Sequence, residues 1–496
     1  MFIWIVVVGG VYSFIAAMGI GSNDAANAFA TSVGSKTLTI RQASLLAVIF
    51  ETAGAILMGN HVTDTIRKGI ADYRCFEDNP ELLMYGCMWV MAAVGGWLFL
   101  ASYLEMPVST THSCVGGMVG MTIALAGGDC VIWYKQVDTF PYVGGVSGII
   151  LSWFISPIFS GIFASFLFAI IRVFVLRKHY NSNRLNFVYP LLVGSTLLIN
   201  SFFIIYKGAK GLGLHKIDAS TAIGISFAIA TAGGLITVPM VPKIRQLVDK
   251  KFARNNNIEL SSTASIELSD ITLNREDLNI RSENQLQIVQ AIHDNAEKFD
   301  PKIEEVFKYL QIFSAVCDSF SHGANDVANA IGPFAAIYTI YKSKGDLSKK
   351  VSMEDDAYWV LALGGIGIAG GLIVYGKKII NAIGTKLCKI TPSRGTVIEL
   401  GSALVIIIGS RLKIPLSTTH CQIGATVGVG LLENKSFKKI EGINGMILIK
   451  TVFGWIITCI IVGITTGLLV AQGVYGPSVP EIRLCGTNFS TYLSSQ

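Results

Sequence analysis

The octapeptide GSNDAANA at residues 21–28 returns as GANDVANA at residues 323–330. A second pair of segments follows in the same order, PVSTTH at 107–112 and PLSTTH at 415–420. The two offsets, 302 and 308 positions, are nearly equal. Two different motifs repeated in the same order indicate that the chain contains two copies of one structural unit.

Both copies lie within long apolar stretches. Of 496 residues, 51% are hydrophobic and only 15% are charged, and the mean hydropathy is +0.55. This composition excludes an ordinary soluble domain and a disordered chain. The net charge of +6 is attributed to loops of a membrane protein and not to binding of nucleic acid. The nine cysteines show no paired Cys-x-x-Cys spacing, and from them we predict no disulfide scaffold and no metal or redox site.

We predict an all-α polytopic membrane protein with about 12 transmembrane segments, an inverted repeat, broken helices and re-entrant hairpins. The apolar segments are centred on residues 3–33, 42–62, 82–104, 108–127, 142–171, 187–206, 217–242, 306–341, 357–376, 395–410, 414–432 and 443–473. The expected organisation is a first membrane half (1–240), a polar and largely disordered linker (241–305), a second membrane half (306–475) and a tail (476–496). Apolar spacing from 284 to 309 predicts an amphipathic helix that leads into the second half.

The Lys and Arg residues of the short loops predict the orientation. Most of them fall on one side of the membrane if the amino terminus lies outside, which makes that side cytoplasmic. The expectation is a multi-pass plasma-membrane protein with both termini extracellular, a cytoplasmic linker 241–305 and an accessible glycosylation sequon at Asn488. The first residues are interpreted as the start of a span and not as a cleaved signal.

The repeat is expected to be inverted, because an odd number of spans, seven, separates the starts of its two copies. Inverted repeats with interrupted helices are typical of secondary transporters, whose binding sites lie near the membrane midplane. A carboxylate inside a span is costly unless it pairs, lines a cavity or binds a cation. The motifs therefore predict a sodium site built from carboxylate and amide oxygens and from carbonyls freed where the glycines break the helices. Its candidate ligands are Asp24, Asn23, Asn27, Asp326, Asn325 and Asn329.

The Pro-x-Ser-Thr-Thr-His segments are typical of helix starts, where free backbone N–H groups and hydroxyls favour an anion. The candidate ligands of a small oxyanion are Ser109, Thr110, Thr111, Ser417, Thr418 and Thr419. Capping of their own helices is the alternative role for these hydroxyls. His112 and His420 have no second ligand at a usable spacing, so we interpret them as candidates for a gating or helix-stabilising hydrogen bond and predict no metal other than sodium.

Three further intramembrane acids have no partner in the repeat. Glu51 and Glu399 are candidate cation ligands or proton carriers, and Asp318 lies where the first half has Ala16. Helix packing is an equally good interpretation of each.

The motif at 323–330, with its variant at 21–28, resembles the signature of the PiT inorganic phosphate transporters. The resemblance covers both membrane halves, and only the linker falls outside it. It implies Na⁺-coupled or, in some members, H⁺-coupled uptake of inorganic phosphate, with Asp24, Asp326 and the neighbouring asparagines as cation ligands and the two Ser-Thr-Thr tips around phosphate. It also adds weight to Glu51 and Glu399. The short Asn- and Ile-rich linker and the missing leader resemble an apicomplexan member.

The leading hypothesis is a symporter that imports inorganic phosphate with Na⁺ by alternating access, in the lipid bilayer, without a cofactor, ATP or nucleic acid. An H⁺-coupled phosphate symporter is the nearest alternative, followed by a sulfate transporter and an anion channel. An intramembrane phosphatase or protease is disfavoured, because one active site does not require a symmetric pair of motifs. A homo-oligomer is left open.

Overall fold

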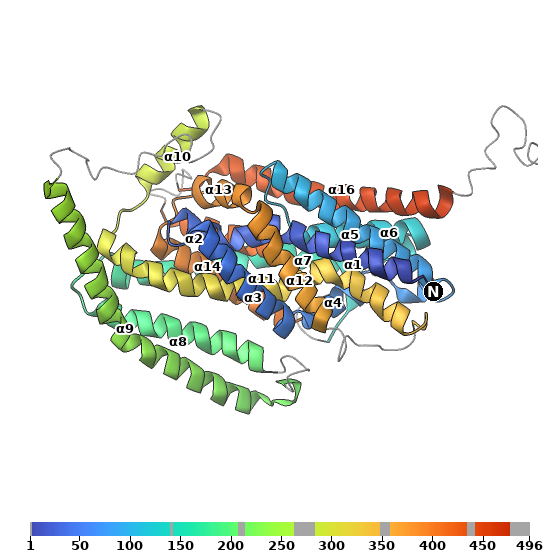
Figure 1. Cartoon of the computed structure of the whole chain (residues 1–496), viewed down its shortest axis with the longest axis horizontal. Helices are drawn as coiled ribbons and strands as arrows, with labels where there is room; N and C mark the ends of the chain where they lie inside the picture. Colours follow the sequence, from blue (N-terminus) through green and yellow to red (C-terminus); the bar gives the residue numbers. More distant parts are fainter. Residues whose placement is uncertain are drawn as a thin grey trace, which may run out of the picture.

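The computed structural model describes residues 2–138, 142–206, 214–261, 283–347, 358–433 and 442–476. Its long helices lie side by side along one axis (Figure 1). Nine helices in this part of the chain are long and apolar enough to cross a membrane. Three predicted segments are not among the nine, because α6 and α15 are too short and α11 carries too many polar residues. The predicted all-α membrane fold is confirmed.

The elements follow the predicted order of two halves and their connecting helices. The first half contains α1 (Ile3–Ile20), the π-helical η1 (Gly21–Ala25), α2 (Ala26–Gly34), α3 (Ile40–Met58), α4 (Asn60–Lys68), η2 (Tyr73–Phe76), α5 (Pro80–Tyr103), α6 (Thr110–Ala126), η3 (Gly128–Cys130) and the antiparallel strands β1 (Lys135–Gln136) and β2 (Val143–Gly144). The connection contains α7 (Gly145–Ile171), the π-helical η4 (Arg172–Leu176), α8 (Arg184–Ile205), η6 (Leu214–Lys216) and α9 (Ala219–Ser261). The second half contains α10 (Glu283–Asn295), α11 (Pro301–Lys342), α12 (Tyr358–Tyr375), α13 (Lys377–Lys386), α14 (Pro392–Arg411), α15 (Thr418–Leu431) and α16 (Gly445–Tyr475).

The two halves run in opposite directions. Helix α1 begins at the amino-terminal end of the molecule, whereas α11 begins at the opposite end, beside the end of α9 (Figure 1). The two helices pack against each other and so bring the two octapeptides to the centre. The inverted repeat is therefore present in the structure.

Two hairpins reach into this centre. Helices α5 and α6 form one of them, and α14 and α15 form the other. At a rise of about 1.5 Å per residue, α6 and α15 extend only part of the way across a bilayer. These short second arms are the predicted re-entrant hairpins, and the Ser-Thr-Thr segments lie at their tips.

Glycines permit the close helix crossings, and two of them separate helices. Gly59 lies between α3 and α4, and Gly376 occupies the matching place between α12 and α13. The motif glycine Gly323 behaves differently from the prediction, because α11 continues through it without a break. A Cβ on Gly323 would lie 2.2 Å from the carbonyl oxygen of Glu51, so this glycine is needed for contact with α3. At Gly21 the helix widens into the π-helical η1 instead of ending.

The expected disorder of the linker is wrong for its described part. Helix α9 continues to Ser261. Helix α10 covers the first part of the predicted amphipathic helix 284–309, which is interrupted by a short turn before α11 begins at Pro301. Val241 and Val248 of α9 are buried in one apolar cluster with Ile303 and Val306 of α11, which explains why the chain stays helical there. Residues 262–282 lie outside the described residues.

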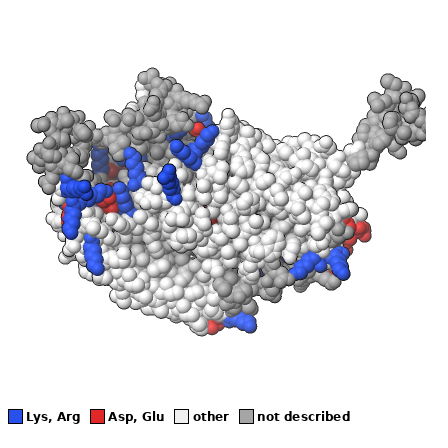
Figure 2. All heavy atoms as spheres, in the orientation of Figure 1, with Lys and Arg blue, Asp and Glu red and all other residues white. Residues whose placement is uncertain are grey.

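Ion pairs and hydrogen bonds hold the turn before α11 against the end of the bundle. The carboxylate of Glu297 accepts hydrogen bonds from Arg172 at 2.6 Å and from Arg177 at 2.8 Å. Its backbone N–H donates to Glu433 at 2.7 Å, and Glu433 in turn accepts from the buried Arg394 at 2.8 Å. We call these five residues the Glu297 cluster. Lys and Arg side chains gather at this end of the molecule in Figure 2.

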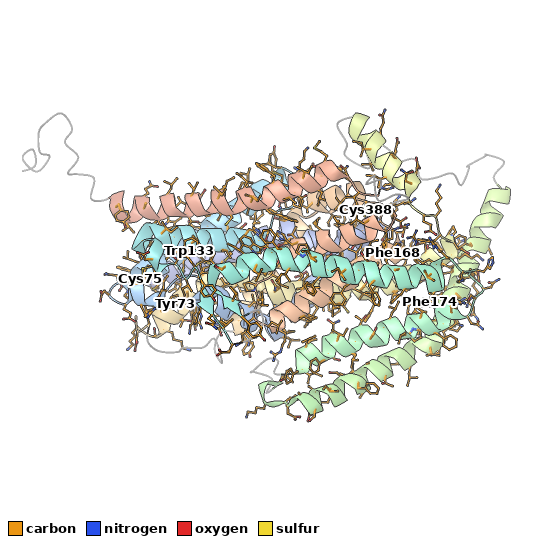
Figure 3. All side chains as sticks on the ribbon, turned by 180° about the vertical axis from the view of Figure 1, so that it is seen from behind. Tyr73, Cys75, Trp133, Phe168, Phe174 and Cys388 are labelled. Carbon is orange, nitrogen blue, oxygen red and sulfur yellow. A yellow bond between two sulfur atoms is a disulfide. The ribbon has the colours of Figure 1, made fainter. Side chains whose placement is uncertain are left out.

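A disulfide at the other end of the molecule was not predicted. Cys75 in η2 is bonded to Cys130 in η3, and an isolated β-bridge pairs Ala71 with Val131 beside it. Figure 3 shows Cys75 at the end of the bundle opposite Phe174. The two cysteines are 55 positions apart in separate loops, so no short spacing between cysteines in the sequence indicates this disulfide.

Candidate functional site

The two Ser-Thr-Thr segments form matching helix starts at the hairpin tips. The hydroxyl of Ser109 accepts a hydrogen bond from the backbone N–H of His112 at 3.3 Å, and Ser417 accepts one from the N–H of His420 at 3.3 Å. Both serines are therefore N-caps, which is the alternative role considered from the sequence. The hydroxyls of the threonines that follow them contact other residues, among them Asp24.

Asp24 and Asp326 meet between the tips, with at most 1% of either residue exposed. The hydroxyl of Thr110 lies 3.0 Å from Asp24 Oδ2 and 3.3 Å from Asp326 Oδ2. Thr418 lies 3.1 Å and 2.6 Å from the same two oxygens, and Thr419 donates to Asp24 Oδ1 at 2.6 Å. Each repeat thus supplies one carboxylate and one hydroxyl that bridges both carboxylates.

The first asparagine of each octapeptide holds its own hairpin. Asn23 accepts from the backbone N–H of Val108 at 3.0 Å and donates to the carbonyl of Met106 at 2.9 Å. With its amide oriented to suit its neighbours, Asn325 donates to the carbonyl of Leu416 at 3.0 Å and accepts from Ser410 at 3.1 Å. These amides fix the tips relative to α1 and α11.

The second asparagine of the second octapeptide lies in the centre. Asn329 donates to Thr110 at 3.1 Å and to Thr111 at 3.2 Å, and it lies 3.3 Å from Asp326. Thr111 in turn donates to the carbonyl of Leu416 at 2.8 Å, which joins the two tips. The side chain of Asn27, its partner in the repeat, lies outside the described residues.

His322 is a central residue that the sequence analysis missed. Its Nδ1 lies 2.8 Å from Glu51 and its Nε2 lies 3.0 Å from Asp326, and all three residues are buried. The Nδ1 contact is a hydrogen bond, whereas Nε2 lies close to the Asp326 carboxylate without forming one. The available signal was its place one helical turn before Asp326. Comparison of the two repeats does not reveal His322, because the matching position in the first half is Ile20.

Glu399 forms a separate buried polar cluster with α2 and α11. It accepts hydrogen bonds from Thr31 and Ser32, both at 2.6 Å, from Gln311 at 3.2 Å and from Ser314. We call these five residues the Glu399 cluster.

The positions that match the Glu399 cluster in the other half are apolar. Met91 takes the place of Glu399, and Phe334 takes the place of Ser32. Both pack near Gly9, which matches Gln311. The Glu399 cluster therefore has no counterpart, and the two halves differ in chemistry although they share a fold.

The two motif histidines meet each other between the hairpins. The ring of His112 stacks on Trp153 with centroids 3.5 Å apart, and His420 packs on Trp455 at 3.7 Å. The two imidazole rings are 4.8 Å apart. His420 also contacts the carbonyl of Trp153 through Nδ1 at 2.9 Å. His420 thus has a hydrogen-bond contact with the backbone of α7, whereas His112 is held by stacking, and the gating or helix-stabilising role of both stays a prediction.

Ligand atoms of Asp24, His322 and Asp326 lie within 4.8 Å of one another, close enough to surround one cation. Asp318 lies on the same helix as His322 and faces a small cavity beside Asp24. Carboxylate and hydroxyl oxygens are the groups that hard cations prefer. The fold is therefore that of a polytopic membrane protein with an inverted repeat, and buried acids and two helix starts meet at its centre.

Comparisons with known proteins agree with this description. The family model described as "Phosphate transporter family" matches residues 20–466. The chain therefore belongs to the phosphate transporter family. The expected relationship to phosphate transporters is confirmed, while the expected apicomplexan origin stays a prediction.

Relatives and a solved structure cover nearly the whole chain. The chain is 31% identical to a putative phosphate permease of Haemophilus influenzae over 92% of this chain and 93% of the relative. It is 27% identical to sodium-dependent phosphate transporter 1 of Xenopus tropicalis over 96% of each chain. A solved structure titled "The sodium-dependent phosphate transporter" superposes with a TM-score of 0.74 at 29% identity, over 94% of this chain and 98% of the other.

Proposed function

We propose that this protein is a secondary symporter that imports inorganic phosphate with Na⁺ by alternating access. The observation that supports this most is the meeting of Asp24 and Asp326 with threonine hydroxyls of both hairpin tips. The family and the sodium-dependent relatives support the choice of phosphate and Na⁺.

Electrostatics sets the order of binding. Phosphate is an anion, and two buried carboxylates repel it unless cations are already present. Na⁺ therefore binds first, to Asp24 and Asp326 with oxygen atoms of their neighbours. The carboxylates then no longer need the hydroxyl protons, and the hydroxyls of Thr110, Thr111, Thr418 and Thr419 turn to the phosphate oxygens.

The remaining predicted ligands take different roles in this proposal. Asn329 stays a candidate sodium ligand, as does Asn27. Asn23 and Asn325 act by positioning the tips, because their amides are bonded to backbone groups of the hairpins. Ser109 and Ser417 act through the N-termini of the helices that they cap, whose N–H groups favour phosphate.

The two glutamates serve separate sites. Glu51 holds Asp326 through His322. Glu399 is a candidate ligand of a further Na⁺, because four polar side chains surround its carboxylate. The triad Glu51–His322–Asp326 also favours the second candidate function, H⁺-coupled phosphate uptake, since an imidazole between two carboxylates can take up and release a proton.

The proposed orientation places both termini outside the plasma membrane and the linker inside. The Lys and Arg residues at the end of α9 support a cytoplasmic position for that end (Figure 2). The Cys75–Cys130 disulfide at the opposite end supports an extracellular position there, because disulfides persist in oxidising compartments.

Uptake of ³²P-phosphate into proteoliposomes tests the function. The purified chain is given an inward Na⁺ gradient, an inward H⁺ gradient or neither, with unlabelled sulfate as competitor. We expect uptake driven by Na⁺ and insensitive to sulfate. Uptake driven only by H⁺ would favour the second candidate, and the absence of uptake under both gradients would contradict the proposal.

Variants of the central acids test the site. Asp24→Asn and Asp326→Asn should each reduce Na⁺-driven uptake by about 10-fold or more, because each removes a buried charge that Na⁺ neutralises. Asp129→Asn, a change at an exposed acid in η3, is the matched control. Unchanged Na⁺ dependence in both central variants would remove the carboxylates from the proposed cation site.

A further inference from the structure

A small cavity lies beside the central carboxylates. Its volume is about 10 Å³, close to the smallest space that holds one water molecule. Five of the side chains that line it carry oxygen atoms: Asp24, Asp318, Ser402, Thr418 and Gln422. Three of these, Asp318, Ser402 and Gln422, take no part in the contacts between the two hairpin tips and the central acids described above.

Polar atoms of three of these residues lack a partner. Asp318 Oδ1, Ser402 Oγ and both amide atoms of Gln422 have no hydrogen bond within the described part of the chain. At most 2% of each residue is exposed. Buried polar atoms without partners are rare and costly, so their convergence on one cavity points to an occupant.

Charge favours a cation as the occupant. The imidazole of His322 also lines the cavity; its Nδ1 contacts Glu51 at 2.8 Å, and its Nε2 lies 3.0 Å from Asp326 without a hydrogen bond. No Lys or Arg forms an ion pair with Asp318 among the salt bridges of the described residues. A water molecule supplies hydrogen bonds but does not neutralise a buried carboxylate, whereas a cation coordinates its oxygen atoms and neutralises it.

The repeat shows that helix packing does not require this polarity. Ala16, Val94 and Cys114 take the matching places of Asp318, Ser402 and Gln422 in the first half. All three are fully buried in the main apolar core. The same crossing is therefore filled by apolar side chains in one half and by oxygen-bearing side chains in the other.

We propose that this cavity binds one Na⁺, coordinated by the carboxylate of Asp318, the amide oxygen of Gln422 and the hydroxyl of Ser402, with Asp24 and Thr418 on its central side. This inference rests on the proposed Na⁺-coupled function and adds one cation to those held by the central pair. Oxygen atoms on five of the lining side chains and room for one dehydrated ion suit a hard monovalent cation.

The test is equilibrium binding of ²²Na⁺ to the purified full chain in detergent without phosphate. Asp318→Asn and Gln422→Leu should each bind one Na⁺ fewer per chain than wild type. Gln422→Glu, which keeps an oxygen, should restore the count. Cys114→Ala, at the matching position of the other half, is the control and should bind as wild type does. Size-exclusion profiles identify any variant that has not folded. Such a variant is replaced by Ser402→Ala, which is a smaller change. We expect Ser402→Ala to raise the Na⁺ concentration at half-saturation about 10-fold.

A second measurement separates this site from the proposed function. In proteoliposomes the ratio of ²²Na⁺ to ³²P-phosphate taken up should fall by one in Asp318→Asn. Equal Na⁺ counts in wild type, Asp318→Asn and Gln422→Leu would overturn the site, whatever the uptake shows. If wild type takes up phosphate without Na⁺, the proposed function fails, and a lower ²²Na⁺ count in the variants still supports the site.

Discussion

His322 lies between two carboxylates that come from different repeats. It is the side chain through which Glu51 on α3 reaches Asp326 on α11. His322→Gln should lower Na⁺-driven phosphate uptake by about 10-fold, because the donors of a glutamine amide lie on one nitrogen and cannot reproduce the spacing of the two imidazole nitrogens between Glu51 and Asp326. Uptake at several Na⁺ concentrations measures the effect, which we expect mainly as weaker Na⁺ dependence.

The control for this prediction is His179→Gln, which changes an exposed histidine near the end of η4. Wild-type uptake by His322→Gln would show that the imidazole is not needed to position Asp326.

At the residue scale the sequence predicted the central acids, because a carboxylate inside a span is costly and its repetition at matching positions indicates a function. It assigned Asn23 and Asn325 to the cation, whereas the structure uses their amides on backbone groups of the tips. Periodicity and motif spacing do not show which backbone group approaches from another helix. His322 was missed because candidate residues were selected mainly by their presence in both repeats, and only the second repeat has a histidine at this position.

At the element scale, the glycine pair Gly370–Gly371 in α12 provides a matched test of helix packing. A Cβ on Gly371 would lie 1.8 Å from the carbonyl oxygen of Met18 on α1, while a Cβ on Gly370 meets nothing within 4 Å. Gly371→Ala should therefore lower the thermal unfolding midpoint in detergent by several degrees, because α1 must move away. Gly370→Ala should leave it unchanged or raise it slightly, since alanine favours helix.

Equal unfolding midpoints for the two alanine variants would contradict the close crossing of α1 and α12.

The existence and order of the helices were predictable, because a long apolar segment in lipid can satisfy its backbone hydrogen bonds almost only as a helix. The uninterrupted course of α11 through Gly323 was not, because a glycine needed for a close approach and a glycine that ends a helix look alike in the sequence. The helical linker was missed because its charged composition outweighed the apolar positions of α9.

At the scale of the whole molecule, the Glu297 cluster ties the turn before α11 to the end of the bundle. Hydrogen bonds from Arg177, and the charges of Arg172 and Arg177, hold the pKa of Glu297 below its usual range despite partial burial. A lowered pKa means that the folded state favours the ionised form. Its contribution to stability is thus present at neutral pH and is lost as the pH falls through the lowered value.

We therefore expect the amides of residues 294–300 to be protected from exchange at pH 7, relative to their intrinsic exchange rates, and to lose this protection as the pH falls through the lowered pKa of Glu297. Glu297→Gln should show fast exchange already at pH 7. Hydrogen exchange read by mass spectrometry measures this difference. The same protection in wild type and in Glu297→Gln would show that the charge does not hold the turn.

The disulfide gives a test of orientation. In Cys75→Ser, Cys130 becomes a free thiol at the amino-terminal end of the molecule. In chains that also carry Cys485→Ser, a membrane-impermeant maleimide added to intact cells should label the Cys75→Ser variant and label the chain with the intact disulfide much less, since the other six described cysteines are mostly buried. Labelling that appears only after the cells are opened would reverse the proposed orientation.

The two halves of this chain share a fold but not a chemistry. The Glu399 cluster is replaced by Met91, Phe334 and Gly9 in the other half. If the halves were chemically identical, the inward-open and outward-open shapes would have equal energy at rest, and the empty protein would spend equal time in each. Here the oxygen-bearing side chains of the Glu399 cluster join α2, α11 and α14 and are not repeated at Met91, Phe334 and Gly9, so we expect the resting protein to prefer one shape, and this preference to change with the Na⁺ concentration.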